Sequence, residues 1–230
     1  MNQQNQSHYS AILPVPRSRE EAKLFYNRIS WWYDYLTAAF ERKYVKSALQ
    51  ELSVQPGKTV LEIGPGTGYG IKVLAQSVGP TGRIYGIDIS SGMLKVASNK
   101  LRKARLTDRV ELYCGDAVYL PYSDNTFDVV FMSFTLELFD TPEIPRVLEE
   151  IKRVLKPGGR LGMVSMSKED GDSTISRLYE WSHKKWPRYV DCRPIYLERF
   201  LVDAGYKTLS KRKIRLMGLP GEIVIAINIK

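Results

Sequence analysis

One segment sets the fold class of this chain: an apolar run that ends in an acid and then breaks into alternating glycines. Residues 59–63 read TVLEI, and residues 64–70 read GPGTGYG. A short continuous apolar run is typical of a parallel strand that is buried on both faces. Glycines directly after such a strand leave the backbone bare where a helix begins. The segment therefore predicts a ligand loop at the carboxyl edge of an α/β sheet.

Strands and helices alternate through the rest of the chain. Further strands are expected at residues 83–88, 110–114, 127–131 and 160–165, and helices at residues 69–78, 91–103 and 142–155. Ser90 is a candidate helix N-cap, and KPGG at residues 156–159 is a candidate helix stop. This alternation indicates a Rossmann-like, doubly wound and mostly parallel sheet.

The ends of the chain differ from its centre. Residues 1–19 are polar and predict a flexible N-terminal tail, and residues 20–55 predict an amphipathic helical cap. Residues 56–230 form the predicted main domain, in which a segment at about 168–195 is helical near 173–186 and is expected to cover the substrate. A helix is expected at 194–204. Two strand-like runs, at 206–216 and 222–229, predict an antiparallel hairpin at the sheet edge.

Composition excludes several classes of protein. The chain has 230 residues, with no apolar run of 18 and no secretory signal, so we expect a cytoplasmic protein with one core. It has two cysteines without a CxxC motif and two histidines, so no metal site is expected.

The glycine loop discriminates between ligands. A phosphate-binding P-loop requires GxxxxGK followed by serine or threonine, which is absent here. A dinucleotide loop requires GxGxxG, but its third glycine is replaced by Tyr69. Glu62 stands just before the loop, where a carboxylate would repel pyrophosphate and attract a cationic amine. The loop therefore favours a ligand with an amino group.

Two further acids follow the next two strands. Asp88 ends the second strand in GIDIS and is placed to accept both hydroxyl groups of a ribose. Asp116, in YCGDA, follows the third strand and is placed near an adenine ring. The expected ligand thus contains an amine, a ribose and a base.

Together, the motifs VLEIGPGTGYG, GIDIS, YCGDAVYLPYSDNTFDVVFMSF and RVLKPGGRL resemble the class I S-adenosylmethionine-dependent methyltransferases, in particular their UbiE-like small-molecule branch. The resemblance covers residues 24–166 strongly. It implies a seven-stranded sheet, S-adenosylmethionine as cofactor and S-adenosylhomocysteine as product. The residues that it assigns to the cofactor are Glu62, Gly64, Gly66, Thr67, Gly68, Asp88, Ile89, Met93, Asp116, Ala117, Ser133 and Phe134.

The acceptor is less clearly marked. After the fourth strand this chain has MSFTLELF, not the [DNS]PP[YFW] motif of enzymes that methylate exocyclic base amines, so a nucleic-acid partner is not expected. It also lacks the arginine–asparagine pair common in quinone methylases of the UbiE-like branch. Tyr33 and Glu137 are the candidate catalytic residues, Tyr33 by resemblance to a segment that closes over the cofactor. Glu137, or alternatively Asp140, is expected to act as a base or as a carboxylate that attracts a cation. Aromatic residues of RISWWYDYL and of residues 181–189 either pack the added helices or close over an apolar acceptor.

Charge is concentrated in the C-terminal part. Residues 1–150 have 17 basic and 17 acidic side chains, whereas residues 151–230 have 17 and 8. Basic and apolar positions alternate in ISRLYEWSHKKWPR, as in a helix on an anionic membrane surface. A soluble anionic substrate is the alternative explanation.

We therefore expect a methyltransferase that acts on a small apolar or lipid-linked acceptor, such as a quinol-like or phenol-like ring, at carbon or oxygen. It could contact membranes peripherally. Methylation of a phospholipid amine or another small amine is the alternative reaction. A non-catalytic S-adenosylmethionine-binding or RNA-associated protein is the alternative from another class.

Overall fold

The computed structural model describes residues 9, 12–15, 17–33, 38–169 and 192–230. Its centre is a seven-stranded sheet with the strand order β3-β2-β1-β4-β5-β7-β6. The strands are β1 (Thr59–Ile63), β2 (Arg83–Asp88), β3 (Val110–Cys114), β4 (Phe127–Ser133), β5 (Leu155–Met166), β6 (Tyr206–Leu216) and β7 (Leu219–Asn228). Strands β1 to β5 are parallel, and β7 is antiparallel to both of its neighbours. The predicted Rossmann-like sheet with its antiparallel C-terminal hairpin is confirmed.

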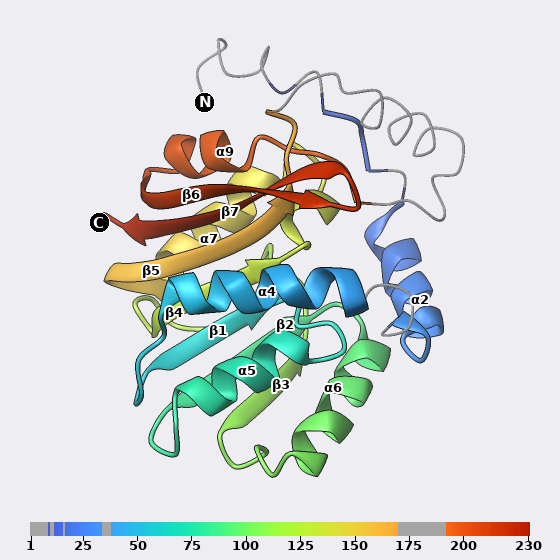
Figure 1. Ribbon diagram of the computed structural model, residues 1–230, viewed down its shortest axis with the longest axis vertical. Coiled ribbons are helices and arrows are strands. Elements are labelled where there is room, and N and C mark those ends of the chain that lie inside the picture. The colour runs from blue at the N-terminus through green and yellow to red at the C-terminus, as the bar shows by residue number, and fades with distance from the viewer. Residues whose placement is uncertain (1–8, 10–11, 16, 34–37, 170–191) are drawn as a thin grey trace.

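Helices cover both faces of the sheet (Figure 1). On one face, α4 (Ala38–Leu52), α5 (Tyr69–Ser77) and α6 (Ser91–Lys103) share an apolar core with the strands. On the other face lie α7 (Ile144–Val154) and α9 (Leu197–Asp203). The helix α2 (Arg19–Ile29) stands beyond the carboxyl ends of the strands, and a 3-10 turn, η1 (Leu136–Leu138), follows β4 (Figure 1).

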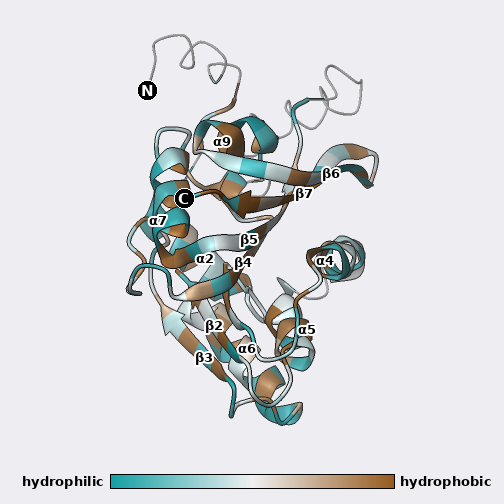
Figure 2. Cartoon of the chain, turned by 90° about the vertical axis from the view of Figure 1, so that its left-hand side faces the viewer, coloured by the Kyte–Doolittle hydropathy of each residue, from teal (hydrophilic) through white to brown (hydrophobic). Residues whose placement is uncertain are grey.

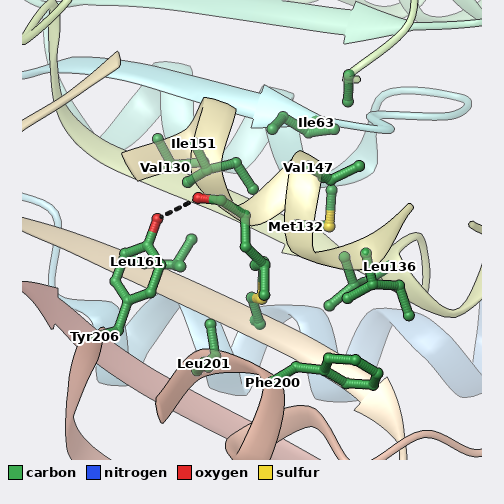
Figure 3. Packing of buried hydrophobic residues seen from close by; sticks show 14 of the residues in the cluster. Ile63, Val130, Met132, Leu136, Val147, Ile151, Leu161, Phe200, Leu201 and Tyr206 are labelled. Carbon is green, nitrogen blue, oxygen red and sulfur yellow. Dashed lines mark hydrogen bonds between the residues drawn. The ribbon is translucent and has the colours of Figure 1, made fainter. Parts of the chain in front are cut away.

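The core beneath α7 and α9 supports the end of β4. Figure 3 shows Met132 and Leu136 packed among side chains of α7 and α9, including Val147 and Phe200. In this layer the buried hydroxyl of Tyr206 donates to a backbone carbonyl, Leu148 O, at 3.0 Å. Apolar contacts with side chains of α7 and α9 therefore hold the turn that follows β4 in place.

Local sequence explains where two helices start. Ser18 and Glu21 form a capping box at α2, since Ser18 Oγ accepts from Glu21 N and Glu21 Oε2 accepts from Ser18 N. Ser90 caps α6, because its Oγ accepts from Met93 N at 3.1 Å. The prediction of Ser90 as an N-cap is confirmed.

The structure differs most from the sequence-based boundaries at the start of β5 and at the C-terminal hairpin. Helix α7 already ends at Val154, and KPGG belongs to the start of β5, where Leu155 pairs with Phe127 before the register shifts. The C-terminal strands are joined by only two residues, Met217 and Gly218, whose φ values of 51° and 87° suit a tight hairpin turn.

The N-terminal segment, predicted as a flexible tail, is packed where it is described. Tyr9 stacks on Phe200 with ring centroids 4.2 Å apart, and Ile12 is buried. Leu13 O accepts from the guanidinium of Arg193 at 2.6 Å. These contacts hold the described N-terminal residues against α9 and Arg193. The predicted helix at 173–186 lies outside the described residues.

Candidate active site

A cavity of about 250 Å³ opens at the carboxyl ends of the parallel strands. Its floor comes from the ends of β1, β2, β3 and β4, and α2 and α4 add residues to its walls. Among its lining residues are Glu62, Gly64, Gly66, Thr67, Asp88, Ile89, Met93, Asp116, Ala117, Ser133 and Phe134. The topology thus brings together the predicted cofactor residues from Glu62 to Phe134, which are 72 positions apart in the sequence.

The glycine loop needs its glycines for two different reasons. Gly64 has a φ of +69°, and a Cβ there would lie 2.3 Å from Thr135 Oγ1, so a side chain is excluded. Gly66 has a φ of +53°, and its N–H donates to Asp88 Oδ2 at 3.0 Å. Gly68 does not line the cavity, and a Cβ there would lie 2.8 Å from Ala97 Cβ on α6. Its role in the structure is close packing between α5 and α6.

Glu62 is a buried carboxyl with an unused oxygen. Only 1% of the residue is exposed, and Oε2 has no hydrogen-bond partner. Gly70 makes room for this side chain, since a Cβ at Gly70 would lie 2.2 Å from Glu62 Oε1. Burial, and secondarily the charge of Asp88, raise the pKa of Glu62 to about 8. A cationic donor in the cavity would supply the missing partner.

Asp88 is fixed by backbone donors. Its Oδ1 accepts from Ser90 N at 2.8 Å, and its Oδ2 accepts from Gly66 N at 3.0 Å. Desolvation raises the pKa of Asp88 to about 6, although both backbone hydrogen bonds act in the opposite direction. Each carboxylate oxygen can accept a second hydrogen bond, so lone pairs remain for a pair of hydroxyl groups.

Asp116 is held by α2 as well as by its own loop. Its Oδ1 accepts from Val118 N at 3.0 Å, and its Oδ2 pairs with Arg19 at 2.7 Å. The same guanidinium also pairs with Glu143. Arg19 therefore ties the start of α2 to the loops after β3 and η1.

A second clasp joins the end of α2 to α6. Asn27 Oδ1 accepts from Ser90 Oγ and from Gly92 N, both at 2.8 Å. It satisfies a free N–H in the first turn of α6. The backbones of α2 and α6 approach closely here, since a Cβ at Gly92 would lie 3.0 Å from Asn27 Cα. Helix α2 is thus fixed over the same loops that form the cavity floor.

The remaining walls are largely aromatic and aliphatic. Tyr26 and Tyr33 lie edge to face with centroids 6.3 Å apart, and Arg42 of α4 lies 5.4 Å from the ring centroid of Tyr69. The apolar and aromatic residues that line the cavity from α2, the turn after it, α4, α5 and the segment after β4 are Ala22, Tyr26, Tyr33, Val45, Tyr69, Phe134, Leu138 and Phe139.

The two predicted catalytic residues lie in different places. Tyr33 lines the cavity. Glu137 does not, because η1 turns its carboxyl group into the interior, where Oε1 accepts from Met166 N at 3.2 Å. Burial raises the pKa of Glu137 to about 7, and the residue is fully buried. This geometry gives no support to Glu137 as a base that touches an acceptor.

Several residues of the site could not be identified from the sequence. Arg19, Asn27 and Arg42 reach the site only because α2 and α4 fold over the sheet. Ser18 and Glu21 do mark the start of α2, but they do not reveal what the helix covers. In the described part of the chain, no group of three or more histidine, cysteine or acidic residues could hold a metal ion.

Comparison with known proteins identifies the family. A family model described as a methyltransferase domain matches residues 60–159. A demethylmenaquinone methyltransferase of Lactobacillus johnsonii is 35% identical over 190 residues, which cover 80% of this chain and 77% of the relative. This chain belongs to the UbiE-like branch of the class I S-adenosylmethionine-dependent methyltransferases.

A second relative and a solved structure agree with the assignment of this chain as a methyltransferase. A demethylmenaquinone methyltransferase of Symbiobacterium thermophilum is 32% identical over 204 residues, with 82% of this chain and 80% of the relative covered. A crystal structure of an S-adenosylmethionine-dependent methyltransferase from Aquifex aeolicus has a TM-score of 0.60 and 30% identity, and covers 80% of this chain and 88% of that one.

The residues of the cavity fit the cofactor of this family. The unpartnered Oε2 of Glu62 suits an ammonium group, and the fixed carboxylate of Asp88 suits the ribose. Because positions 64 and 66 are glycines, the loop backbone can approach the part of the cofactor that lies between the ammonium group and the ribose. When bound, S-adenosylmethionine supplies a methyl group that is activated by its sulfonium. The protein has to position the acceptor and exclude water.

Proposed function

We propose that this methyltransferase acts on a quinol-like or phenol-like ring of an apolar or lipid-linked small molecule, at carbon or oxygen, and releases S-adenosylhomocysteine. The aromatic and aliphatic wall of the cavity is the observation that carries the proposal. Such a wall accommodates a flat apolar ring by burial and by ring contacts. The names of the two demethylmenaquinone methyltransferases support the same class of acceptor.

The cofactor is held, in this proposal, by the loops at the ends of the first three strands. Glu62 binds the ammonium group, Asp88 binds the ribose hydroxyls, and Met93 with Ala117 packs on the adenine. Asp116 then accepts a hydrogen bond from the adenine beside its ion pair with Arg19, for which its hydrogen-bonding capacity suffices because one carboxylate has about four lone pairs.

The acceptor lies between α2, α4 and the segment after β4. Tyr26 and Tyr33 pack against its ring, and Arg42 is the cation of α4 that lines the cavity. A guanidinium remains charged at all relevant pH values, so it favours the phenolate form of a hydroxyl placed beside it. A phenolate is the nucleophile at oxygen, and its delocalised charge activates the adjacent ring carbons. Arg42 stabilises the phenolate but takes up no proton, unlike the carboxylate base that the sequence suggested at Glu137. The proton of the hydroxyl, or that of the ring carbon after methylation at carbon, leaves to water.

A second candidate reaction, N-methylation of an amine, is favoured by the carboxylates that line the cavity. Asp140 and Glu143 are among them. Both are already engaged, however, since Asp140 Oδ1 accepts from Val15 N at 3.2 Å and Glu143 pairs with Arg19. This pairing reduces the attraction that they would exert on a cationic amine.

The test is a methyl-transfer assay with mass-spectrometric detection of products. The purified protein would be incubated with S-adenosylmethionine and either a prenylated naphthoquinol kept reduced, a simple alkylphenol, or phosphatidylethanolamine. We expect methylated quinol, and a strong loss of product with Arg42→Gln at unchanged cofactor affinity. Product from phosphatidylethanolamine alone would establish the amine reaction and overturn the ring acceptor.

A further inference from the structure

Three of the most exposed large apolar side chains lie at the carboxyl-end edge of the sheet. Trp31 is 78% exposed, Trp32 is 68% exposed, and Met217 is 71% exposed. The sequence indicated that the two tryptophans would either pack on the sheet or close over the acceptor. Instead, both face outward beside Tyr33, which does line the cavity.

These side chains flank the cavity from two directions. The tryptophans directly follow α2, and Met217 forms the turn between β6 and β7. Tyr44 links the turn to α4, because its hydroxyl donates to Arg215 O, and the adjacent Val45 lines the cavity. Figure 1 shows α2 and the β6–β7 turn on the same side of the molecule, beyond the ends of the parallel strands.

Met217 is an unusual residue for its position. A two-residue hairpin turn with positive φ at both positions favours asparagine or aspartate before glycine. Here a methionine adopts a φ of 51° with most of its side chain in water. Local turn stability does not explain this choice. Figure 2 shows hydrophobic colour at this turn, next to the largely hydrophilic β6.

Basic side chains accompany the apolar ones. Arg28 lies near the end of α2, Lys43 lies in the first turns of α4, and Arg215 precedes the β6–β7 turn. All three are exposed. Tryptophan side chains prefer the interface between water and hydrocarbon, and lysine and arginine favour anionic headgroups there.

We propose that Trp31, Trp32 and Met217, together with Arg28, Lys43 and Arg215, form a docking rim for an anionic lipid bilayer. The apolar side chains insert among the headgroups and the basic ones pair with lipid phosphates. This peripheral contact needs no spanning segment, and among the described residues no helix is long and apolar enough to cross a bilayer.

Docking by this rim would turn the cavity toward the bilayer. A lipid-linked acceptor could then reach the site without passing through water, a consequence that rests on the proposed function. The docking itself does not depend on that function. The basic segment at 175–188, for which the sequence predicts a membrane contact, lies outside the described residues, so the rim is a separate surface.

The test is flotation of the full-length protein with phosphatidylcholine vesicles, with and without phosphatidylglycerol. We expect binding to the anionic vesicles that weakens with added salt. Met217→Ser should weaken it by about tenfold, and Arg215→Gln by about fivefold. Matched controls come from the opposite edge of the sheet. Ile229→Ser changes an apolar side chain that is 58% exposed, and Arg105→Gln removes an exposed charge. Neither control should weaken binding.

A second measurement uses tryptophan fluorescence. Anionic vesicles should shift the emission to shorter wavelength, and the Trp31→Phe/Trp32→Phe variant should lose most of this shift. The proposal is overturned if the wild type does not bind anionic vesicles, even if a soluble protein partner is found. It is also overturned if the rim variants behave like their controls. Calorimetry with S-adenosylmethionine checks that each variant is folded, and no turnover is needed, so failure of docking is distinct from failure of the proposed reaction.

Discussion

Replacing Glu62 by glutamine should stabilise the cofactor-free protein, and more so as the pH rises. The carboxyl is buried, its Oε2 has no partner, and its pKa is raised from an ordinary value of 4.5 to about 8. In the folded protein it therefore remains mostly protonated at pH 7. In the unfolded chain it ionises above pH 4.5, which favours unfolding.

The size of the effect follows from this difference. Each pH unit between about 4.5 and 8 costs the folded state about 1.4 kcal/mol. At pH 7 the cost is about 3 kcal/mol. Glutamine cannot ionise and has nearly the same shape, so it fits against Gly70. Glu62→Gln should thus be about 3 kcal/mol more stable at pH 7 and nearly equal to the wild type at pH 4.5.

The assay is urea unfolding of both proteins from pH 5 to pH 8 without cofactor. The control is Glu111→Gln, which makes the same substitution at an exposed carboxyl on β3. A difference for Glu62→Gln that stays constant across this range would show that Glu62 ionises in the folded protein. The reasoning about its buried, unpartnered oxygen would then be refuted. With saturating S-adenosylmethionine, the stability difference between the two proteins should become smaller, since the carboxylate can form an ion pair with an ammonium group whereas the glutamine amide offers only a neutral hydrogen bond.

Other predictions concern the loops and the N-terminal clasp. Asp88→Ala should weaken S-adenosylmethionine binding by about 1.5–3 kcal/mol through a lost charge-assisted hydrogen bond, and an unchanged affinity by calorimetry would exclude its ribose role. Gly64→Ala should be at least about 1–2 kcal/mol less stable by thermal unfolding than Gly79→Ala. Gly79 is the matched control, because it has a similar φ of +66° but no atom within 4 Å of the added Cβ. Equal losses of stability in the two variants would mean that Thr135 moves aside. Arg193→Met should speed amide exchange around Leu13, because the buried guanidinium donates to Leu13 O and to other acceptors; unchanged exchange would show that this segment is held elsewhere.

Much of the cofactor side of the site could be predicted from the sequence. Glu62, Asp88 and Asp116 each follow a recognisable strand, and parallel strands bring their carboxyl ends to one edge. The same logic does not extend to Gly68, whose position in the motif suggested a cofactor contact. Its added Cβ would meet Ala97, so in this structure the glycine brings α5 and α6 together.

Residues from the N-terminal region were less predictable. Tyr33 lines the cavity as expected, but Trp31 and Trp32 beside it are exposed. Aromatic residues at helical spacing give the same sequence pattern whether their side chains are buried or face solvent. Only the docking of α2 through Asn27 and Arg19 decides which face of the segment meets the cavity.

The sequence by itself determined the order of the elements and the residues at their ends, because apolar periodicity, a serine cap and glycine spacing act over a few neighbouring positions. Tertiary structure decided where single side chains point. Glu137 and Leu138 are adjacent in η1, yet Leu138 lines the cavity whereas Glu137 is buried against β5. The buried guanidinium of Arg193 donates a hydrogen bond to Leu13 O, 180 positions away in the sequence. Such contacts depend on which surfaces the folded sheet brings together, and no local pattern records them.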